Sequence, residues 1–499
     1  MSEFDPSSPE SPSSTDELGD PETSPNLPAT TLAAHAAPHL QDELDVRSLG
    51  RHTTREILRL SWPVMLAQGA VTFAGIIDRA MVGRLGDGAG GAATPLAAVG
   101  LASQFFFLVQ SSLFAIGLAC VALMARAIGA RTPRQAQLAF SASIQVAVAF
   151  SLLLSVVIAL ISRAALELLG AEPPVVEAAI PYLNYVLASS VLLAVSLVIE
   201  SALRANKDMR TPMWIAAIVM AAKLGLNWLL IFGNWGLPRL ELVGAGLATA
   251  LSQALALVLL VAAIVNQRRD SPLALTWRDI TRINSRSVEV IRIAIPGIAE
   301  RLVMNLAMIS YIWVLSRHYG TIAVAAYTVG IPLLAFSWIP GTAYAQAAAT
   351  MIGQCLGARD PDQATRIGWH SARLAIVTAI VLGLAFGYLR YPLARLLTND
   401  ADVIAALGPF MLVLALAQPL LQLQFALGGA HRGAGDTLSP LIAAMIGNWI
   451  FRLPLAFGLG VFLHADIIWI WCALIFDHLA RSIYLTISFK RGKWKERLD

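Results

Sequence analysis

Long apolar runs, separated by short polar stretches, recur along most of the chain. Most runs reach roughly 20 residues, the length that lets a helix cross the hydrocarbon core of a bilayer. They are continuous and do not alternate apolar with polar at every second position, so helices are favoured over the strands of a membrane barrel. The pattern predicts an all-α integral membrane protein with about twelve transmembrane helices.

The expected helices form two groups of six. In the first half they cover Ile57–Leu85, Pro95–Ala125, Ala136–Ile161, Val176–Leu203, Pro212–Phe232 and Val243–Val265. In the second half they cover Val288–Ser316, Ile322–Ile352, Ile367–Leu389, Val403–Leu427, Leu438–Leu463 and Ile467–Phe489. We therefore expect an N-lobe over residues 54–265 and a C-lobe over residues 288–489.

Three polar segments lie outside these lobes. Residues 1–45 are rich in Ser, Pro, Asp and Glu, which predicts a disordered cytoplasmic tail. This tail has neither a basic start nor an apolar stretch, so it does not resemble a signal peptide, and we expect the first membrane helix to direct insertion. Residues 266–287 form a basic linker between the lobes, and residues 490–499 form a basic tail.

Lysines and arginines concentrate in alternate loops, which predicts the orientation in the membrane. The opposite loops hold fewer, namely Arg84, Arg163, Arg239, Arg317, Arg390 and Arg395. The basic loops and the tail are expected to be cytoplasmic, with both termini on that side. Their main cations are Arg126, Arg131, Arg134, Arg204, Lys207, Arg210, Arg268, Arg269, Arg278, Arg282, Arg286, Lys490, Arg491, Lys493, Lys495 and Arg497.

An internal repeat relates the two halves. The segment Gly129-Ala130-Arg131-Thr132-Pro133 recurs as Gly357-Ala358-Arg359-Asp360-Pro361, and Asp208 and Pro212 recur at the same offset as Asp436 and Pro440. Because each half has an even number of helices, both share one orientation. The sequence therefore predicts a parallel repeat about a pseudo-twofold axis along the membrane normal, with substrate bound between the halves.

Composition narrows the function. The chain is 57% hydrophobic and 14% charged, with a net charge of only +4, so its basic residues are loop charges and not a nucleic-acid surface. The eight histidines lack metal-ligand spacing, and the motifs of a P-loop, a zinc protease or a serine hydrolase are missing from the sequence. We expect no enzyme, metal or cofactor, and transport that is driven by a proton or sodium gradient.

Two carboxylates fall inside predicted membrane helices. Asp78 lies in the middle of the first helix, where a charge is costly and commonly serves as a proton or ion relay; the alternative is a structural Asp that neighbouring hydroxyls satisfy. Glu300 lies in the seventh helix. It either attracts cationic substrates into a cavity or pairs with Arg301 or Arg452.

Several motifs, in the same order, resemble the multidrug and toxin extrusion (MATE) family. They run from Pro63 with Ile77-Asp78 through the turn Arg204–Pro212, then Leu229–Gly233 and Gly244–Thr249, to Gly353–Ala358 and Arg432–Thr437. The resemblance covers about Thr54 to Phe489. It implies a secondary-active antiporter that exports organic compounds, cationic or amphipathic, across the cell membrane by alternating access.

The resemblance also implies a coupling site, with one departure. Asp78 matches the family's helix-1 aspartate and Thr249 its threonine, but Lys223 stands at the position of an asparagine and Asn227 at that of an aspartate. A lysine there would repel sodium, so we expect an Asp78–Lys223 pair and proton coupling. The alternative is that Lys223 extends to the membrane interface.

The substrate cavity is expected to include Glu300 and the intramembrane amides Gln253, Asn305, Gln346 and Asn184. The tenth helix carries Gln418, Gln422 and Gln424 in place of a carboxylate, which argues against a second cation site there. We expect a monomer whose partners are a small-molecule substrate and the lipid bilayer. One alternative is a flippase for lipid-linked or polysaccharide substrates. Such proteins usually carry more helices and a basic central cavity, which the sequence does not indicate.

Overall fold

The computed structural model describes residues 38–83, 93–168, 171–236, 238–265, 271–281, 285–397 and 400–496, with side chains from His52 onward. Residues 1–37 of the amino-terminal tail and the loop after the first helix, residues 84–92, lie outside these ranges. The first helix begins at Pro38, so the last part of the tail that was expected to be disordered is helical.

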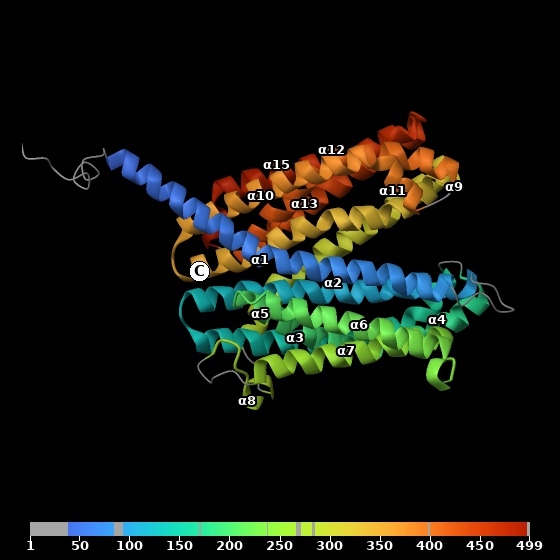
Figure 1. Cartoon of the computed structure of the whole chain (residues 1–499), viewed down its shortest axis with the longest axis horizontal. Coiled ribbons are helices and arrows are strands. Elements are labelled where there is room, and N and C mark those ends of the chain that lie inside the picture. Colours follow the sequence, from blue (N-terminus) through green and yellow to red (C-terminus); the bar gives the residue numbers. More distant parts are fainter. Residues whose placement is uncertain are drawn as a thin grey trace, which may run out of the picture. The chain divides into compact units, whose positions relative to one another are not determined.

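The described chain is built from helices (Figure 1). The first half contains α1 (Pro38–Gly83), α2 (Ala93–Gly129), α3 (Pro133–Leu168), α4 (Pro173–Ala188), α5 (Ser190–Ala205), α6 (Arg210–Phe232) and α7 (Glu241–Val265). A short linker helix, α8 (Trp277–Thr281), follows. The second half contains α9 (Arg286–Gly357), α10 (Pro361–Tyr388), α11 (Arg390–Leu397), α12 (Ala401–Gly433), α13 (Leu438–Met445), α14 (Leu453–Phe457) and α15 (Ile467–Arg491).

Helix α9 combines the predicted seventh and eighth helices without an assigned break. It nevertheless reverses direction, because the rings of Tyr311 and Tyr327 contact each other in a tilted arrangement with centroids 5.6 Å apart. A straight helix would separate these residues by about 24 Å at 1.5 Å per residue. The reversal therefore lies between them, where the sequence predicts a loop. Both arms of α9 contact α2, the first where Gly297 faces Ala115 and the second where Gly353 faces Ala125.

Two other membrane helices are irregular. The predicted fourth helix is the bent pair α4 and α5, which meet at 42° beside Ser189. The Ser190 hydroxyl at this bend hydrogen-bonds the hydroxyls of Ser151 and Ser155 on α3, at 2.9 and 2.7 Å. The predicted eleventh helix contains two π-helical stretches, Ile446–Arg452 and Gly458–Phe462, on either side of α14.

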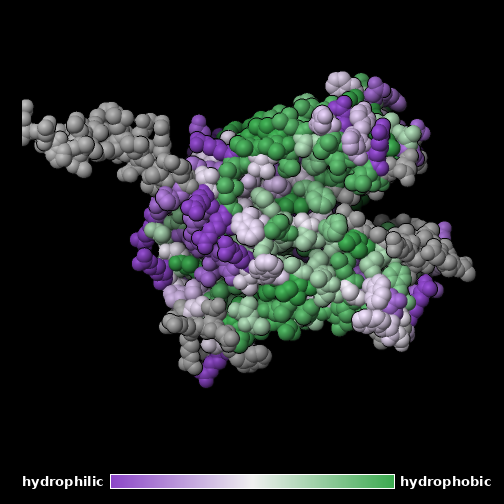
Figure 2. Space-filling model, viewed as in Figure 1, coloured by the Kyte–Doolittle hydropathy of each residue, from purple (hydrophilic) through white to green (hydrophobic). Residues whose placement is uncertain are grey.

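Ten described helices are long and apolar enough to cross a membrane, or eleven when the bent pair counts as one span. The second arm of α9 corresponds to the remaining predicted helix. The all-α membrane fold and its two-lobed repeat agree with the sequence. Figure 2 shows hydrophobic surface along the helices of both halves and hydrophilic residues gathered at the end that holds the chain's carboxyl terminus.

The two halves touch at that hydrophilic end through glycines that the internal repeat relates. A Cβ built on Gly129 of α2 would lie 1.9 Å from the Gln354 carbonyl oxygen, and one built on Gly357 of α9 would lie 2.0 Å from the Arg126 carbonyl oxygen. Only glycine permits backbones to approach so closely. At the opposite end, α4 of the first half and α11 of the second lie apart (Figure 1).

Helix α1 contacts both halves. Its residues Ile57, Leu60 and Val64 pack in one apolar cluster with Tyr344 and Ala347 of α9. In addition, the Thr342 hydroxyl of α9 donates a hydrogen bond to the Gln68 side-chain oxygen of α1 at 2.5 Å. Helix α1, which belongs to the first half, is therefore held against α9 of the second half by both apolar and polar contacts.

Candidate functional site

The first candidate site is a polar cluster between α1 and α6. The Lys223 ammonium donates a hydrogen bond to Asp78 Oδ2, and the Asn227 side-chain amide donates to Asp78 Oδ1 at 2.6 Å. Lys223 and Asn227 are one helical turn apart, so one face of α6 presents both donors to the carboxylate. The side chains of Lys223 and Asp78 are 24% and 23% exposed, so the pair is partly screened from solvent.

Three other predicted site residues lie elsewhere. Thr249 was expected in the coupling site, whereas Gln253 and Asn184 were expected in the substrate cavity, whose described lining does not include them. The Thr249 hydroxyl of α7 donates to the Ala245 carbonyl of its own helix at 3.0 Å. Gln253, also on α7, is half-buried, and Asn184 of α4 is exposed. The structure thus brings together Asp78, Lys223 and Asn227, and leaves these other three side chains outside their hydrogen-bond network.

A cavity of about 250 Å³ lies between α2 and the helices of the second half. Three of the predicted cavity residues, Glu300, Asn305 and Gln346, line it, and the side-chain oxygen of Gln346 is buried without a hydrogen-bond partner. Thr342, which holds Gln68 of α1, lines it as well. The hydrogen bond between Thr342 and Gln68 therefore links the cavity to α1, the helix that carries Asp78.

Glu300 is internally paired, but with neither arginine that the sequence suggested. Its carboxylate accepts a hydrogen bond from Arg432 Nη2 of α12 at 2.5 Å, and the side chains of Arg432 and Glu300 are 12% and 8% exposed. Arg432 lies more than one hundred residues after Glu300 in the sequence, so the local spacing of residues does not indicate this contact. The neighbouring Arg301 also lines the cavity, with its guanidinium carbon 5.5 Å from the ring centroid of Phe114 on α2.

A second buried ionic cluster was missed in the sequence. Asp477 of α15 is fully buried and accepts hydrogen bonds from Arg481 at 2.5 and 3.0 Å. Arg452 Nη1 lies 3.9 Å from the same carboxylate. The signal was present, because Asp477, His478 and Arg481 are three ionisable residues close together in the apolar run of the twelfth predicted helix.

The backbone around this cluster is shaped to receive it. A Cβ on Gly447 would lie 2.1 Å from Asp477 Oδ1, so only glycine leaves space for the carboxylate there. The π-helical stretch Ile446–Arg452 contains both Asn448 and Arg452, which line the cavity. π-Helical turns occur frequently at functional sites. His478 completes the cluster through a 3.0 Å hydrogen bond between its Nδ1 and the Gln424 amide.

The charge of the cavity differs from the expectation that the protein has no basic central cavity. Its lining contains two carboxylates, Glu300 and Asp477, and four arginines. The central cavity is therefore basic, although the sequence did not indicate a basic cavity. The difference arises because these charges come from four separate helices that only the fold brings together. The arginines are Arg301, Arg432, Arg452 and Arg481.

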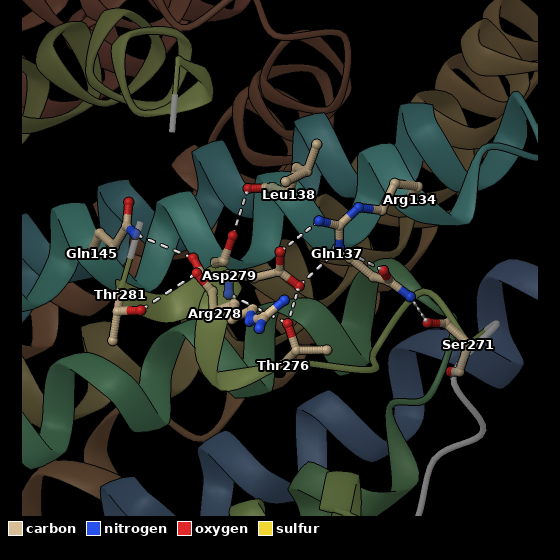
Figure 3. Close-up of polar contacts among 10 residues, drawn as sticks. Arg134, Gln137, Leu138, Gln145, Ser271, Thr276, Arg278, Asp279 and Thr281 are labelled. Atoms are coloured by element: carbon tan, nitrogen blue, oxygen red, sulfur yellow. Dashed lines mark hydrogen bonds and ion pairs between the residues drawn. The ribbon is translucent and has the colours of Figure 1, made fainter. Parts of the chain in front are cut away.

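The linker is fastened to the first half at its hydrophilic end (Figure 3). Arg134 of α3 binds the Asp279 carboxylate of α8 with two hydrogen bonds, at 2.6 and 2.8 Å. These bonds, together with one from the Thr276 hydroxyl, lower the pKa of Asp279 to about 2. The Gln145 amide of α3 also donates to the Ile280 carbonyl at 2.8 Å, so the described part of the linker is held to α3 as a unit.

Metal binding has little support in the part of the chain that the structure describes. Within those residues, no three His, Cys, Asp or Glu side chains group together in a way that could hold a metal ion. The carboxylates of Asp78, Glu300 and Asp477 instead bind ammonium, guanidinium or amide groups.

Comparison with known proteins identifies the family. The MatE family model matches residues 63–229 and 296–457. A probable multidrug resistance protein NorM from Bradyrhizobium diazoefficiens is 30% identical over 449 residues, covering 87% of this chain and 92% of the relative. The corresponding protein of Thermotoga maritima is 26% identical over 450 residues, covering 89% of this chain and 93% of its own.

The fold is also similar to a solved structure. This is the outward-facing conformation of a multidrug resistance MATE family transporter, with a TM-score of 0.81 and 19% identity, covering 88% of this chain and 97% of the other. That likeness agrees with the two-lobed helical architecture described above. The chain belongs to the MATE family and is a multi-pass membrane protein of the multidrug efflux type.

Proposed function

We propose that the chain is a proton-coupled antiporter that exports amphipathic organic compounds, with Asp78 as the group that exchanges the proton. The contact between Lys223 and Asp78 carries this proposal. A sodium ion needs several oxygen ligands and net negative charge, as hard cations do. Here the lysine ammonium already neutralises the carboxylate, so a proton is the cation that fits.

The Lys223–Asp78 pair supports a simple conformational cycle. When Asp78 takes up a proton, the ion pair is lost and the Lys223 charge is left without its partner, which is costly away from bulk water. An arrangement of the helices that rehydrates Lys223 then becomes favoured, and the population shifts toward it. Because α1 also contacts Thr342 of the cavity through Gln68, the shift reaches the substrate site.

Orientation is part of the same proposal. Basic residues dominate the end at which the halves touch, including Arg126, Arg131, Arg204 and Arg359. If cytoplasmic loops carry the excess of Lys and Arg, that end faces the cytoplasm. With this orientation, the halves touch at the cytoplasmic end, and α4 and α11 lie apart at the outer end (Figure 1).

The test uses the purified protein in liposomes with two dansyl probes that carry opposite charges, dansylglycine and dansylcadaverine. A pH step should drive movement of at least one probe, beyond that in protein-free liposomes, and a sodium step at fixed pH and membrane potential should not. Asp78→Asn should abolish the pH-driven component and remain folded, whereas Glu167→Gln, a carboxylate change on the exposed surface of α3, should retain it. Sodium-driven movement, or full activity of Asp78→Asn, would refute the coupling assignment.

The basic cavity favours one second candidate, a flippase for lipid-linked anions. This candidate predicts that the reconstituted protein moves a fluorescently labelled anionic phospholipid between leaflets. Export of soluble organic compounds predicts no such movement above the rate of protein-free vesicles. The names of the sequence relatives favour export.

A further inference from the structure

We infer that the cavity recognises an anionic group, a carboxylate, sulfonate or phosphate, on an otherwise apolar substrate, which makes organic anions the preferred cargo. This inference deepens the proposed export function and depends on it. It rests on the positions of charged side chains around the cavity, on the contacts that each of them already makes, and on the apolar character of the remaining wall.

The two cavity carboxylates are already neutralised by protein groups. Glu300 is paired with Arg432 at 2.5 Å, and its side chain is 8% exposed. Asp477 is paired with Arg481 at 2.5 Å and is completely buried. A cationic substrate would have to displace a buried arginine from either carboxylate, which would leave that arginine uncompensated.

Arg301 supplies a positive charge that is only partly offset, because the neighbouring Glu300 carboxylate already binds Arg432. Among the described residues, its guanidinium lies within ion-pair distance of no carboxylate, and its carbon lies 5.5 Å from the ring centroid of Phe114. The side chain is largely enclosed and lines the cavity. Because a charge in a low-dielectric site is stabilised by an opposite charge, an anion in the cavity would bind to it strongly.

Arg452 supplies a second donor. Its guanidinium lies 4.2 Å from the ring centroid of Tyr311, and Nη2 donates to the Tyr327 hydroxyl at 3.3 Å. Its Nε is buried without a hydrogen-bond acceptor in the described structure. Asp477 is 3.9 Å away and binds Arg481 more closely, so Arg452 is only partly neutralised.

The remainder of the wall is mainly apolar and aromatic, interspersed with polar side chains such as Asn305, Gln346 and Asn448. It suits an amphipathic molecule whose ring system packs while its anionic group reaches the arginines. These side chains come from both halves, since α2 contributes part of the wall and α9 and α12 contribute most of the rest. A bound anion would therefore lie where the halves meet. The apolar lining includes Phe107, Phe114, Leu118, Met304, Trp338 and Phe425.

Equilibrium binding to the full-length protein in detergent, with no ion gradient, tests this inference. Dansylglycine and dansylcadaverine share one aromatic body and carry a carboxylate and an ammonium, respectively. Dansylglycine should bind about tenfold more tightly or better, because a charge-assisted hydrogen bond is typically worth that factor or more. Arg301→Gln should weaken dansylglycine binding by about tenfold without weakening dansylcadaverine.

Two further variants complete the test. Arg301→Lys keeps the charge and should retain most of the preference for dansylglycine, so it remains informative if Arg301→Gln does not fold. Arg163→Gln, on the exposed surface of α3, changes the net charge equally and should leave both affinities unchanged.

Tighter binding of dansylcadaverine would overturn the inference. So would undetectable binding of dansylglycine, or an equal loss of dansylglycine affinity in Arg163→Gln. These outcomes are separate from failure of the proposed function. If a pH step moves only dansylcadaverine, proton-coupled export stands and the anion preference falls. If dansylglycine binds as expected but a pH step moves neither probe, the proposed coupling fails.

Discussion

Substituting the glycines at the hydrophilic end should open that end. Gly129→Ala would place a Cβ 1.9 Å from the Gln354 carbonyl oxygen, and Gly357→Ala would place one 2.0 Å from the Arg126 carbonyl oxygen. Ordinary contacts of a Cβ lie at 3.4–4 Å. Both clashes are with backbone atoms, so no side-chain rotation relieves them, and the two halves must separate.

The size of the effect follows from the cost of overpacking a close contact, about 1–3 kcal/mol for each substitution. That energy is lost only in the state where the halves touch at this end. The equilibrium should therefore shift by about 5- to 150-fold toward a state in which this end is open. Because the internal repeat relates the two glycines, the two variants should behave alike.

The assay is the distance between spin labels at Arg131→Cys and Arg359→Cys, two exposed positions in the repeat-related loops. Gly129→Ala and Gly357→Ala should each add a longer distance to the distribution. Gly100→Ala is the matched control on α2, because a Cβ there meets nothing within 4 Å. If Gly129→Ala and Gly357→Ala both keep the distance distribution of the Gly100→Ala protein, the glycine contacts do not hold this end closed.

Three further predictions concern orientation, the linker and the coupling pair. Cysteines at Arg131, Arg278 and Lys493 should react only with reagents applied from the cytoplasm, and external labelling of any one would reverse the assigned topology. The Arg134–Asp279 contact should lose its stabilising effect as pH falls from about 4 toward 2, because the folded pKa of Asp279 is lowered to about 2 from an ordinary value near 4; Asp279→Asn should remove this pH dependence from proteolysis of the linker, and an unchanged pH profile would contradict the assignment. Lys223→Met or Asp78→Asn alone should lower the free energy of unfolding in detergent by about 2 kcal/mol, which is less than for a fully buried pair because both side chains are about a quarter exposed. The double variant should lose less than the sum of the two single losses. Additive losses would show that the residues do not interact.

Much of the fold could be predicted from local sequence patterns. Continuous apolar runs located the membrane helices, and repeated Gly-Ala-Arg segments indicated two related halves. The loop predicted between the two arms of α9 corresponds to a reversal that the contact between Tyr311 and Tyr327 demonstrates. The bend at Ser189 and the π-helical stretches were not predicted, because they depend on contacts with α3 and α15 and not on composition.

The candidate sites could also be predicted only in part, because some of their contacts join helices that are distant in the sequence. Asp78 and Lys223 could be matched because each is conspicuous in an apolar helix and the motif order aligned them. The contact between Glu300 and Arg432 joins two distant helices, so sequence spacing left its partner open. The basic character of the cavity could not be read from single helices, since each contributes only one or two charges and the sum depends on which of them face inward.

The most direct test of proton exchange measures whether protons enter liposomes while dansylglycine leaves them. Liposomes that contain the protein, a pH indicator and dansylglycine are diluted into dansylglycine-free, sodium-free buffer at equal pH, with the membrane potential clamped. In the protein molecules oriented for export, outward movement of the probe should carry protons inward, so the lumen should acidify, and Asp78→Asn should show no acidification above protein-free liposomes. Probe efflux through the wild-type protein without any change in internal pH would contradict proton antiport at Asp78.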